Sequence, residues 1–249
     1  MSPSSAAALD ARTVHVWMAH PDRLLAAAPG HASWLSPAER ARATRYRDPE
    51  DGARYRATRV LIRGILAGVV GRRPGTLDFV ENAHGRPSLR APVAGGLDFN
   101  VSRSPAWAVL AVNAGAACGI DVEDLSRGND IASIARRFAP SERALLERVP
   151  EAERRRTFFA LWTLKEAFLK ALGTGLTLPL GAAAFTLEPG QPPRATFGPA
   201  LAEDPAAWSF AQLMPDAGHL AAVAVRSGQP PTLVVHGEVE TCETVAAAR

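Results

Sequence analysis

Two apolar hairpin patterns, each preceded by a helical pattern, constrain the fold of this chain more than any other sequence feature. The hairpins cover residues 97–112 and 208–225, and long helical patterns cover residues 51–70 and 151–172. Short apolar runs bounded by turn residues predict the strands, and apolar residues spaced three or four apart predict the helices. The repetition predicts an α+β fold with two similar halves that join near residues 112–119.

We expect an N-terminal half over residues 1–115, a C-terminal half over residues 116–226, and a loosely held tail over residues 227–249. Ser36 and Glu39 have the S-x-x-E spacing of a capping box, which predicts the start of a helix at this point. A chain of 249 residues buries enough surface to hold a core without covalent staples.

The composition indicates the cellular compartment and the kind of partner that we expect for this protein. Cys118 and Cys242 stand in neither a CxxC nor a CxxH context, which favours a reducing compartment. No apolar run reaches the length of about 18 residues that a membrane span needs. Residues 1–10 lack the pattern of a signal peptide. We therefore expect a cytoplasmic protein with no membrane partner. The net charge of +3 favours an acidic or phosphorylated partner.

The two kinds of basic residue are used very unequally. The chain has 26 arginines but only two lysines, Lys165 and Lys170. Lysine carries a compact ammonium that can give up a proton, whereas arginine keeps its proton at any ordinary pH. The lysine pair therefore indicates a place that requires an ammonium, although coincidence in an arginine-rich composition also explains it.

Two carboxylates share one face of a predicted strand. In an extended segment Asp121 and Glu123 point to the same side, and Ile120 and Val122 point to the other. Carboxylates this close repel each other unless a cation or protons neutralise their charge, so they are suited to bind Mg²⁺. A solvated strand end with two acids accounts for the spacing equally well.

Polar residues also follow one face of the second long helical pattern. Trp162, Glu166 and Lys170 are spaced four apart and share a face. The pattern is either part of an active site or an ordinary surface Glu–Lys pair worth about 0.3–0.5 kcal/mol. Residues 84–87 and 100–104 combine turn or hydroxyl residues with arginine, as anion sites do, although plain surface turns have the same composition.

Six segments carry a family resemblance when they are taken in order. They are Gly-Arg-Pro at 85–87, FNVSRS at 99–104, GIDVE at 119–123, Phe138 with Glu142, WTLKEAFLK at 162–170, and GTGL at 173–176. Together they resemble the 4′-phosphopantetheinyl transferases of the long, surfactin-synthetase-activating type, over about residues 34–226. The resemblance implies two α+β halves related by a pseudo-two-fold axis, with the active site between them. It also implies transfer of the phosphopantetheine arm of coenzyme A to a carrier-protein serine, with release of adenosine 3′,5′-bisphosphate.

The same resemblance implies roles for individual residues. Asp121, Glu123 and Glu166 are the expected Mg²⁺ ligands. Glu166 is our candidate base for the serine proton, and Lys170 our candidate for stabilising or protonating the leaving oxygen. The expected contacts to coenzyme A are Arg42, Gly85, Arg86, Pro87, Ser102, Arg103, Asp121, Lys165 and Lys170.

Two positions depart from the family pattern. Arg103 stands where the family usually has histidine, so it can bind a phosphate but cannot shuttle a proton. Arg86 stands where the family commonly has lysine, and this change preserves the positive charge.

The expected partners are apo carrier proteins of polyketide, nonribosomal-peptide or fatty-acid synthases, which are typically acidic helical bundles. Arg136, Arg137 and the arginines of residues 143–156 would either dock them or form an ordinary solvated face. We expect a monomer.

Two other functions stay open: a Mg²⁺-dependent phosphodiester or pyrophosphate hydrolase, and a basic module that binds nucleic acid without catalysis. Scattered basic residues and sparse aromatics do not favour nucleic acid as a partner. The sequence has no GxGxxG, Walker-A, HExxH or GxSxG motif, and its histidines lack metal-ligand spacing. It also lacks a second acidic cluster for a two-metal hydrolase.

Overall fold

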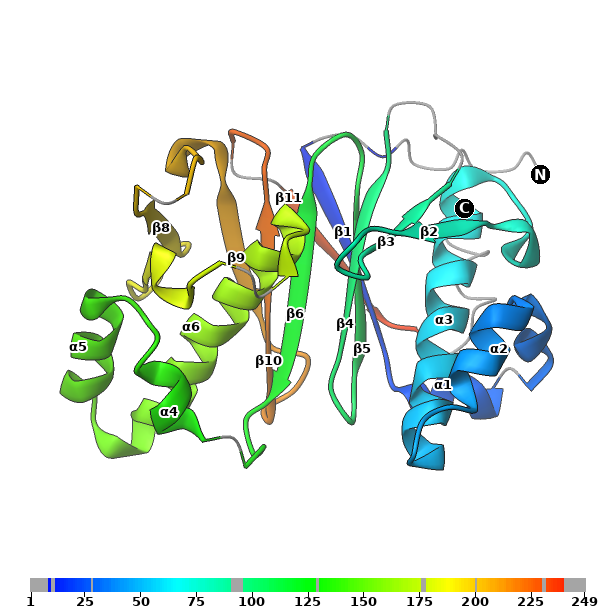
Figure 1. The fold of residues 1–249 in the computed structure, drawn as a ribbon, viewed down its shortest axis with the longest axis horizontal. Coiled ribbons are helices and arrows are strands. Elements are labelled where there is room, and N and C mark those ends of the chain that lie inside the picture. Colours follow the sequence, from blue (N-terminus) through cyan, green and yellow to red (C-terminus); the bar gives the residue numbers. More distant parts are fainter. Residues whose placement is uncertain are drawn as a thin grey trace.

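The protein is arranged as a helix, a sheet, a second sheet and a second helix packed in layers (Figure 1). The computed structural model describes residues 9, 12–27, 29–90, 96–128, 130–175, 178–199, 201–229 and 232–239. The mixture of helices and mainly antiparallel strands confirms the predicted α+β class. None of the described helices combines the length and hydropathy that a bilayer span needs.

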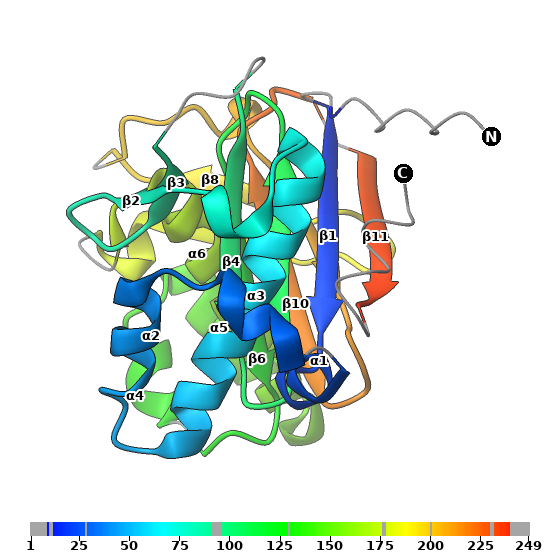
Figure 2. The same ribbon diagram turned by 90° about the vertical axis from the view of Figure 1, so that its right-hand side faces the viewer.

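The first sheet has the strand order β11-β1-β5-β4, and all its neighbours are antiparallel except β1 and β11. The long helix α3 covers the outer face of this sheet (Figure 2). A capping box starts α2 as predicted, and α3 starts after the N-cap Asp48. The bounds are β1 Thr13–Ala19, α1 Pro21–Ala27, α2 Pro37–Ala43, α3 Pro49–Val70, β2 Phe79–Glu81, β3 Pro87–Leu89, β4 Asp98–Arg103, β5 Ala108–Asn113 and β11 Thr232–Glu238.

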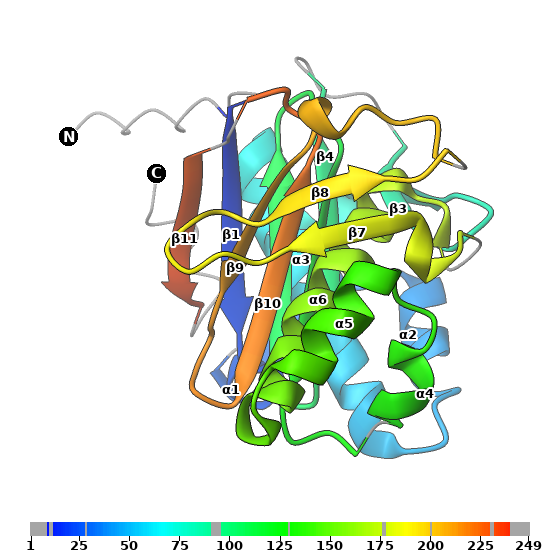
Figure 3. The same ribbon diagram turned by 90° about the vertical axis from the view of Figure 1, so that its left-hand side faces the viewer.

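The second sheet has the order β6-β10-β9, with antiparallel neighbours throughout. Helix α6 covers its outer face, and α5 and the β7–β8 hairpin pack beside that helix (Figure 3). Gly173 ends α6 in the left-handed region, as the sequence predicts. The bounds are β6 Cys118–Asp124, α4 Ile131–Ala135, α5 Pro140–Arg148, α6 Glu151–Leu172, β7 Ala183–Thr186, β8 Arg194–Phe197, β9 Ser209–Leu213 and β10 His219–Val225.

The inner faces of the two sheets pack against each other. Strand β5 is apolar on both sides, because Leu110 faces α3 whereas Val109 faces the second sheet. Strands β4 and β6 lie next to each other at the junction, where the amide of Ile120 donates to Asn100 Oδ1 at 3.0 Å. The contact between the sheets is made mainly by small and branched side chains: Val14, Val16, Val109, Ala111, Ile120, Val122, Ala221, Val223 and Val225.

Helix α6 approaches β6 most closely at Gly119. A Cβ atom at this position would lie 2.0 Å from the carbonyl oxygen of Ala167 and 2.5 Å from the amide nitrogen of Ala171. No side chain fits there, so only glycine lets the helix backbone pack directly on the strand. Asp121 follows two residues later, on the face that α6 covers.

Part of the predicted tail is an ordered strand instead. Residues 232–238 form β11, which pairs with β1 from Thr13↔Thr232 onward, and the amide of Val239 donates to Met18 O at 2.7 Å. The apolar run at 233–235 lies in β11, the edge strand of the first sheet, and its partner strand β1 lies at the other end of the chain. Residues 240–249 and Leu176 of the GTGL segment lie outside the described residues. The two-fold relation between the halves stays a prediction.

A buried glutamate fixes the start of a short helix in each half. Glu39, at the third position of α2, accepts from Arg59 Nε at 2.5 Å and from Arg63 Nε at 2.8 Å, and both arginines lie on α3. Glu142, at the third position of α5, pairs with Lys165 Nζ on α6 at 2.7 Å. In each half, the acidic cap of a short helix therefore neutralises a buried cation on the long helix.

We expect Glu39→Gln to lower the free energy of unfolding by about 3–5 kcal/mol, because it leaves two buried guanidinium groups without a counter-charge. Urea unfolding near neutral pH measures this loss. The matched control is Glu50→Gln, because Glu50 forms an exposed pair with Arg54 and should cost less than about 1 kcal/mol. Equal losses in the two variants would contradict the assignment.

Candidate active site

Acidic side chains from two elements lie near one another where α6 covers β6. Asp121 and Glu123 come from β6, and Glu166 comes from α6. Ile120 and Val122, between and beside the acids, point into the contact between the sheets. The alternation predicted for this strand is therefore what directs both carboxylates toward the helix.

Lys170 connects these acids to the first half. Its Nζ lies 2.6 Å from Asp121 Oδ1, 2.7 Å from Ser102 Oγ and 3.2 Å from the carbonyl oxygen of Ile120. Ser102 Oγ donates to Asp121 Oδ1 at 2.8 Å. The structure thus brings together one residue each from β4, β6 and α6, and we call Ser102, Asp121 and Lys170 the junction triad.

Burial and mutual repulsion change the acidity of the carboxylates. The pKa of Glu166 is raised to about 7: burial is the main cause, Asp121 and Glu123 contribute to the rise, and Lys170 opposes it. Burial, assisted by Asp121, also raises the pKa of Glu123, although contacts with Trp162 and Arg127 lower it. Without a metal, the carboxyl of Glu166 therefore keeps its proton to a higher pH than an ordinary glutamate does.

The carboxylates fit a magnesium ion in a limited way. Asp121 Oδ2 and Glu166 Oε1 are buried and have no hydrogen-bond partner among the described residues. Glu123 uses its oxygens for Trp162 Nε1 at 2.9 Å and Arg127 Nη1 at 3.3 Å. In the described part of the chain, no three acidic, histidine or cysteine side chains are grouped closely enough to hold a metal. Mg²⁺ commonly takes one or two carboxylates and completes its shell with water and substrate phosphate, so Asp121 and Glu166 suffice.

A cleft of about 600 Å³ opens beside the junction triad, and Ser102 belongs to both. Three arginines line the cleft, whereas Glu81 is its only acid among the described residues and pairs with Arg42 at 3.0 Å. The cleft therefore favours an anionic ligand. It contains five of the expected coenzyme A contacts. They are Arg42, Gly85, Pro87, Ser102 and Arg103.

Two tyrosines of the cleft were not identified from the sequence. Arg103 Nη2 donates to Tyr46 Oη at 2.9 Å, and its guanidinium lies over the rings of Tyr46 and Tyr55. Arg42 lies over Tyr55 as well. Tyr46 and Tyr55 are the only tyrosines of the chain, which is the one signal that could have drawn attention to them.

Arg86, another expected contact to coenzyme A, is not among the residues that line the cleft. Its guanidinium contacts Asp98 and the carbonyl oxygens of Cys118 and Ala171. These partners occupy both terminal nitrogens, so the side chain serves the contact between the halves.

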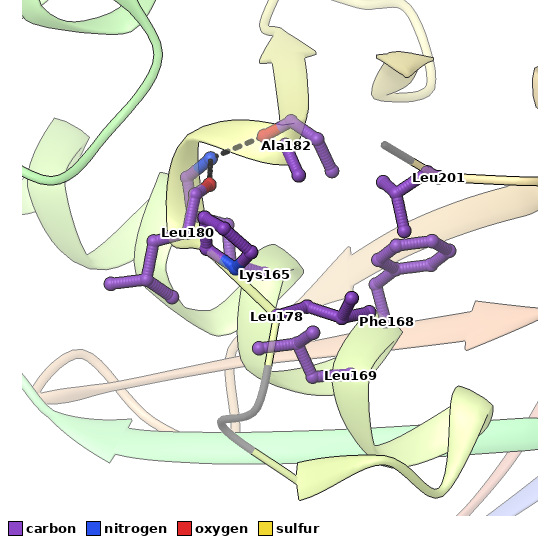
Figure 4. A pocket seen from close by; sticks show the side chains of 9 residues that line it. Lys165, Phe168, Leu169, Leu178, Leu180, Ala182 and Leu201 are labelled. Atoms are coloured by element: carbon purple, nitrogen blue, oxygen red, sulfur yellow. Dashed lines mark hydrogen bonds between the residues drawn. The ribbon is translucent and has the colours of Figure 1, made fainter. Parts of the chain in front are cut away.

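Lys165, an expected contact to coenzyme A, also lies apart from the junction triad and does not line the cleft. Its Nζ is buried against Glu142 and lies 2.8 and 2.5 Å from the carbonyl oxygens of Leu180 and Ala183. Figure 4 shows the Lys165 side chain beside Leu180. Burial lowers its pKa, and Glu142 opposes this shift. Five helical residues turn about 140° past one full turn, so Lys165 and Lys170 occupy different faces of α6.

Protein-family comparisons match the chain in two consecutive segments. Residues 16–115 match the family described as 4'-phosphopantetheinyl transferase, N-terminal. Residues 117–224 match the 4'-phosphopantetheinyl transferase superfamily. Together the two matches cover most of the chain.

Individual relatives carry the same name. The 4'-phosphopantetheinyl transferase HetI of Nostoc sp. is 38% identical over 214 residues, which are 85% of this chain and 87% of the relative. The 4'-phosphopantetheinyl transferase psf-1 of Bacillus pumilus is 31% identical over 83% of this chain and 84% of the relative. A structure of Helicobacter pylori holo-(acyl-carrier-protein) synthase with coenzyme A matches 43% of this chain and 96% of that one, with 21% identity and a TM-score of 0.34.

We expect Glu166→Gln to stabilise the metal-free protein at alkaline pH. A carboxyl whose pKa is raised on folding contributes stability at low pH and loses it as pH rises toward the folded value of about 7. In the presence of a chelator, the variant should melt at least about 2 °C above the wild type near pH 8, and this gain should shrink near pH 5. Thermal unfolding across this range measures the gain, and a difference independent of pH would contradict the repulsion described above.

Proposed function

Because the chain belongs to the 4′-phosphopantetheinyl transferase superfamily, we propose that it transfers the 4′-phosphopantetheine group of coenzyme A to a serine of apo carrier proteins. Adenosine 3′,5′-bisphosphate is the second product. The observation that best supports this is the position of Ser102, which borders the cationic cleft and contacts Asp121 and Lys170. A substrate bound in the cleft by its phosphates would have its pyrophosphate beside the carboxylates.

Magnesium fits this function as the metal of the site. Asp121 and Glu166 would hold it through their unpartnered oxygens, and Glu123 would join them by exchanging one of its present contacts. When bound there, the ion would neutralise charge on the pyrophosphate and polarise it toward attack. Magnesium dependence is a general property of the family, and its assignment to these three residues is our proposal.

The protein's own groups would handle the proton and the leaving oxygen. Glu166 takes the proton of the carrier serine. The serine oxygen forms a bond to the β-phosphorus of coenzyme A, and the bond from that phosphorus to the bridging oxygen breaks. Lys170, whose ammonium lies at the junction triad, stabilises the negative charge left on the bridging oxygen.

The cleft would hold the nucleotide end of coenzyme A. Arg42 and Arg103 supply fixed positive charge for its phosphate groups, and the tyrosine rings beneath them hold both guanidinium groups in place. Gly85 and Pro87 also line the cleft, where their backbone could contact the ligand. Because Arg103 cannot lose its proton in this pH range, it acts in binding and not in proton transfer.

An arginine-rich surface over α4, α5 and the start of α6 suits an acidic carrier protein. Arg136, Arg137, Arg143 and Arg156 are exposed there. Opposite charge on the carrier would mainly raise the association rate.

We further propose that the protein acts as a monomer in the cytoplasm. We also propose that its two halves divide between residues 115 and 116. The ranges of the two family matches support that division.

The decisive experiment incubates an apo carrier protein with coenzyme A, Mg²⁺ and this protein, and follows the carrier by mass spectrometry. Gain of one phosphopantetheine on the carrier serine is expected. Hydrolysis of coenzyme A without carrier modification would overturn the transferase assignment and favour the hydrolase. Asp121→Asn and Glu166→Gln should each reduce transfer by about 10²–10⁴-fold, whereas exposed Glu188→Gln should not.

The arginine at position 103 should make its phosphate contact to coenzyme A independent of pH. In the wild type, we expect the phosphate contact of residue 103 to contribute equally to the KM for coenzyme A between about pH 6 and pH 8, since the guanidinium stays charged. For Arg103→His, the KM should rise across the same range as the imidazole loses its proton near about pH 6.5. Steady-state kinetics at saturating carrier tests this, and parallel pH profiles for the two proteins would contradict a phosphate contact by Arg103.

A further inference from the structure

A turn of the first half caps the C-terminal end of α6 in the second half. Asn82 Nδ2 donates to the carbonyl oxygen of Gly173 at 3.0 Å, and Arg86 Nη1 donates to the carbonyl oxygen of Ala171 at 3.2 Å. Carbonyl groups at the end of a helix have no partner within the helix and carry partial negative charge. A guanidinium therefore binds favourably at this place.

The same guanidinium also reaches two strands. Arg86 Nη2 lies 2.6 Å from Asp98 Oδ2 and donates to the carbonyl oxygen of Cys118 at 2.9 Å. Asp98 Oδ2 in turn accepts from the amide of Cys118 at 2.7 Å. Asp98 is the first residue of β4 and Cys118 the first of β6, so one side chain joins the starts of both strands to the end of α6.

These three elements are the ones that supply the junction triad. Ser102 lies further along β4, Asp121 lies three residues after Cys118 on β6, and Lys170 directly precedes Ala171 on α6. A shift of any one element relative to the others would separate side chains that now lie within 2.8 Å of each other. The contacts of Arg86 oppose such a shift at the end of each element.

We propose that Arg86 is a positioning residue for the transfer reaction. It does not touch coenzyme A but fixes β4, β6 and α6 in the register that assembles the junction triad. This inference rests on the proposed function, because it concerns the geometry of that site. It replaces the phosphate contact that the sequence resemblance implies for this position.

Arginine suits this role better than lysine does. Its planar fork donates in two directions at once, here to Ala171 from one nitrogen and to Asp98 and Cys118 from the other. A lysine ammonium at the same place is a single point and cannot span the same three partners. Arg86→Lys therefore keeps the charge while it breaks the connection between the elements.

The kinetic test compares Arg86→Lys with the wild type. We expect kcat to fall about 10–100-fold through misplacement of the junction triad, while the KM for coenzyme A changes less than about 3-fold. The matched control is Arg90→Lys, which changes an exposed arginine paired with Asp78 and should leave both constants unchanged. A rise in KM that exceeds the fall in kcat would overturn the proposal, and so would the absence of any effect.

A second variant and a second measurement cover a failure of Arg86→Lys to fold. Asp98→Asn removes the charge partner of Arg86 without changing a residue of the cleft. It should also lower kcat more than it raises KM, and an unchanged kcat would count against the proposal.

Hydrogen exchange gives a readout that needs no activity. In Asp98→Asn, amides at the end of α6 and the start of β6 should exchange faster while those of α3 do not, and unchanged exchange would overturn the positioning role. If the wild type shows no transfer, the proposed function fails while exchange still decides the role of Arg86.

Discussion

The packing of the two sheets against each other determines everything that the candidate site can do. Each half supplies only part of the site: Ser102 and the arginine-lined cleft come from the first, and the carboxylates and Lys170 from the second. Small, branched side chains in the contact let β4 and β6 lie next to each other. Because burial of apolar surface has no direction, polar contacts such as that from Ile120 to Asn100 are needed to set the alignment.

The site itself works against stability. Asp121 and Glu166 each bury an oxygen that has no partner among the described residues, and the charge of Asp121 raises the pKa of both Glu123 and Glu166. Other buried charged groups are paired with an opposite charge, as Glu39 is with two arginines and Glu142 is with Lys165. This contrast separates groups that hold the fold from groups kept ready for a ligand.

Local patterns in the sequence were sufficient to predict most of the helices and strands, and the features that were missed depend on long-range contacts. Gly173 could be predicted to end α6, and Asp121 and Glu123 to share a face, because neighbours along the chain settle both. The position of Lys165 could not be predicted from the sequence, because it depends on contacts with Glu142 and with two carbonyl groups from other segments. The placing of Arg86 required three partners from distant segments. Strand β11 pairs with β1, at the opposite end of the chain, and no periodicity records such a pairing.

Gly119 has a consequence that reaches beyond its own position. Because it has no side chain, the backbones of β6 and α6 touch, and the distance between them is as short as two main chains allow. This backbone contact therefore sets how closely the two elements that carry Asp121 and Glu166 can approach each other. Any residue with a side chain at position 119 would push β6 and α6 apart and move both carboxylates, although Gly119 itself has no group that could react.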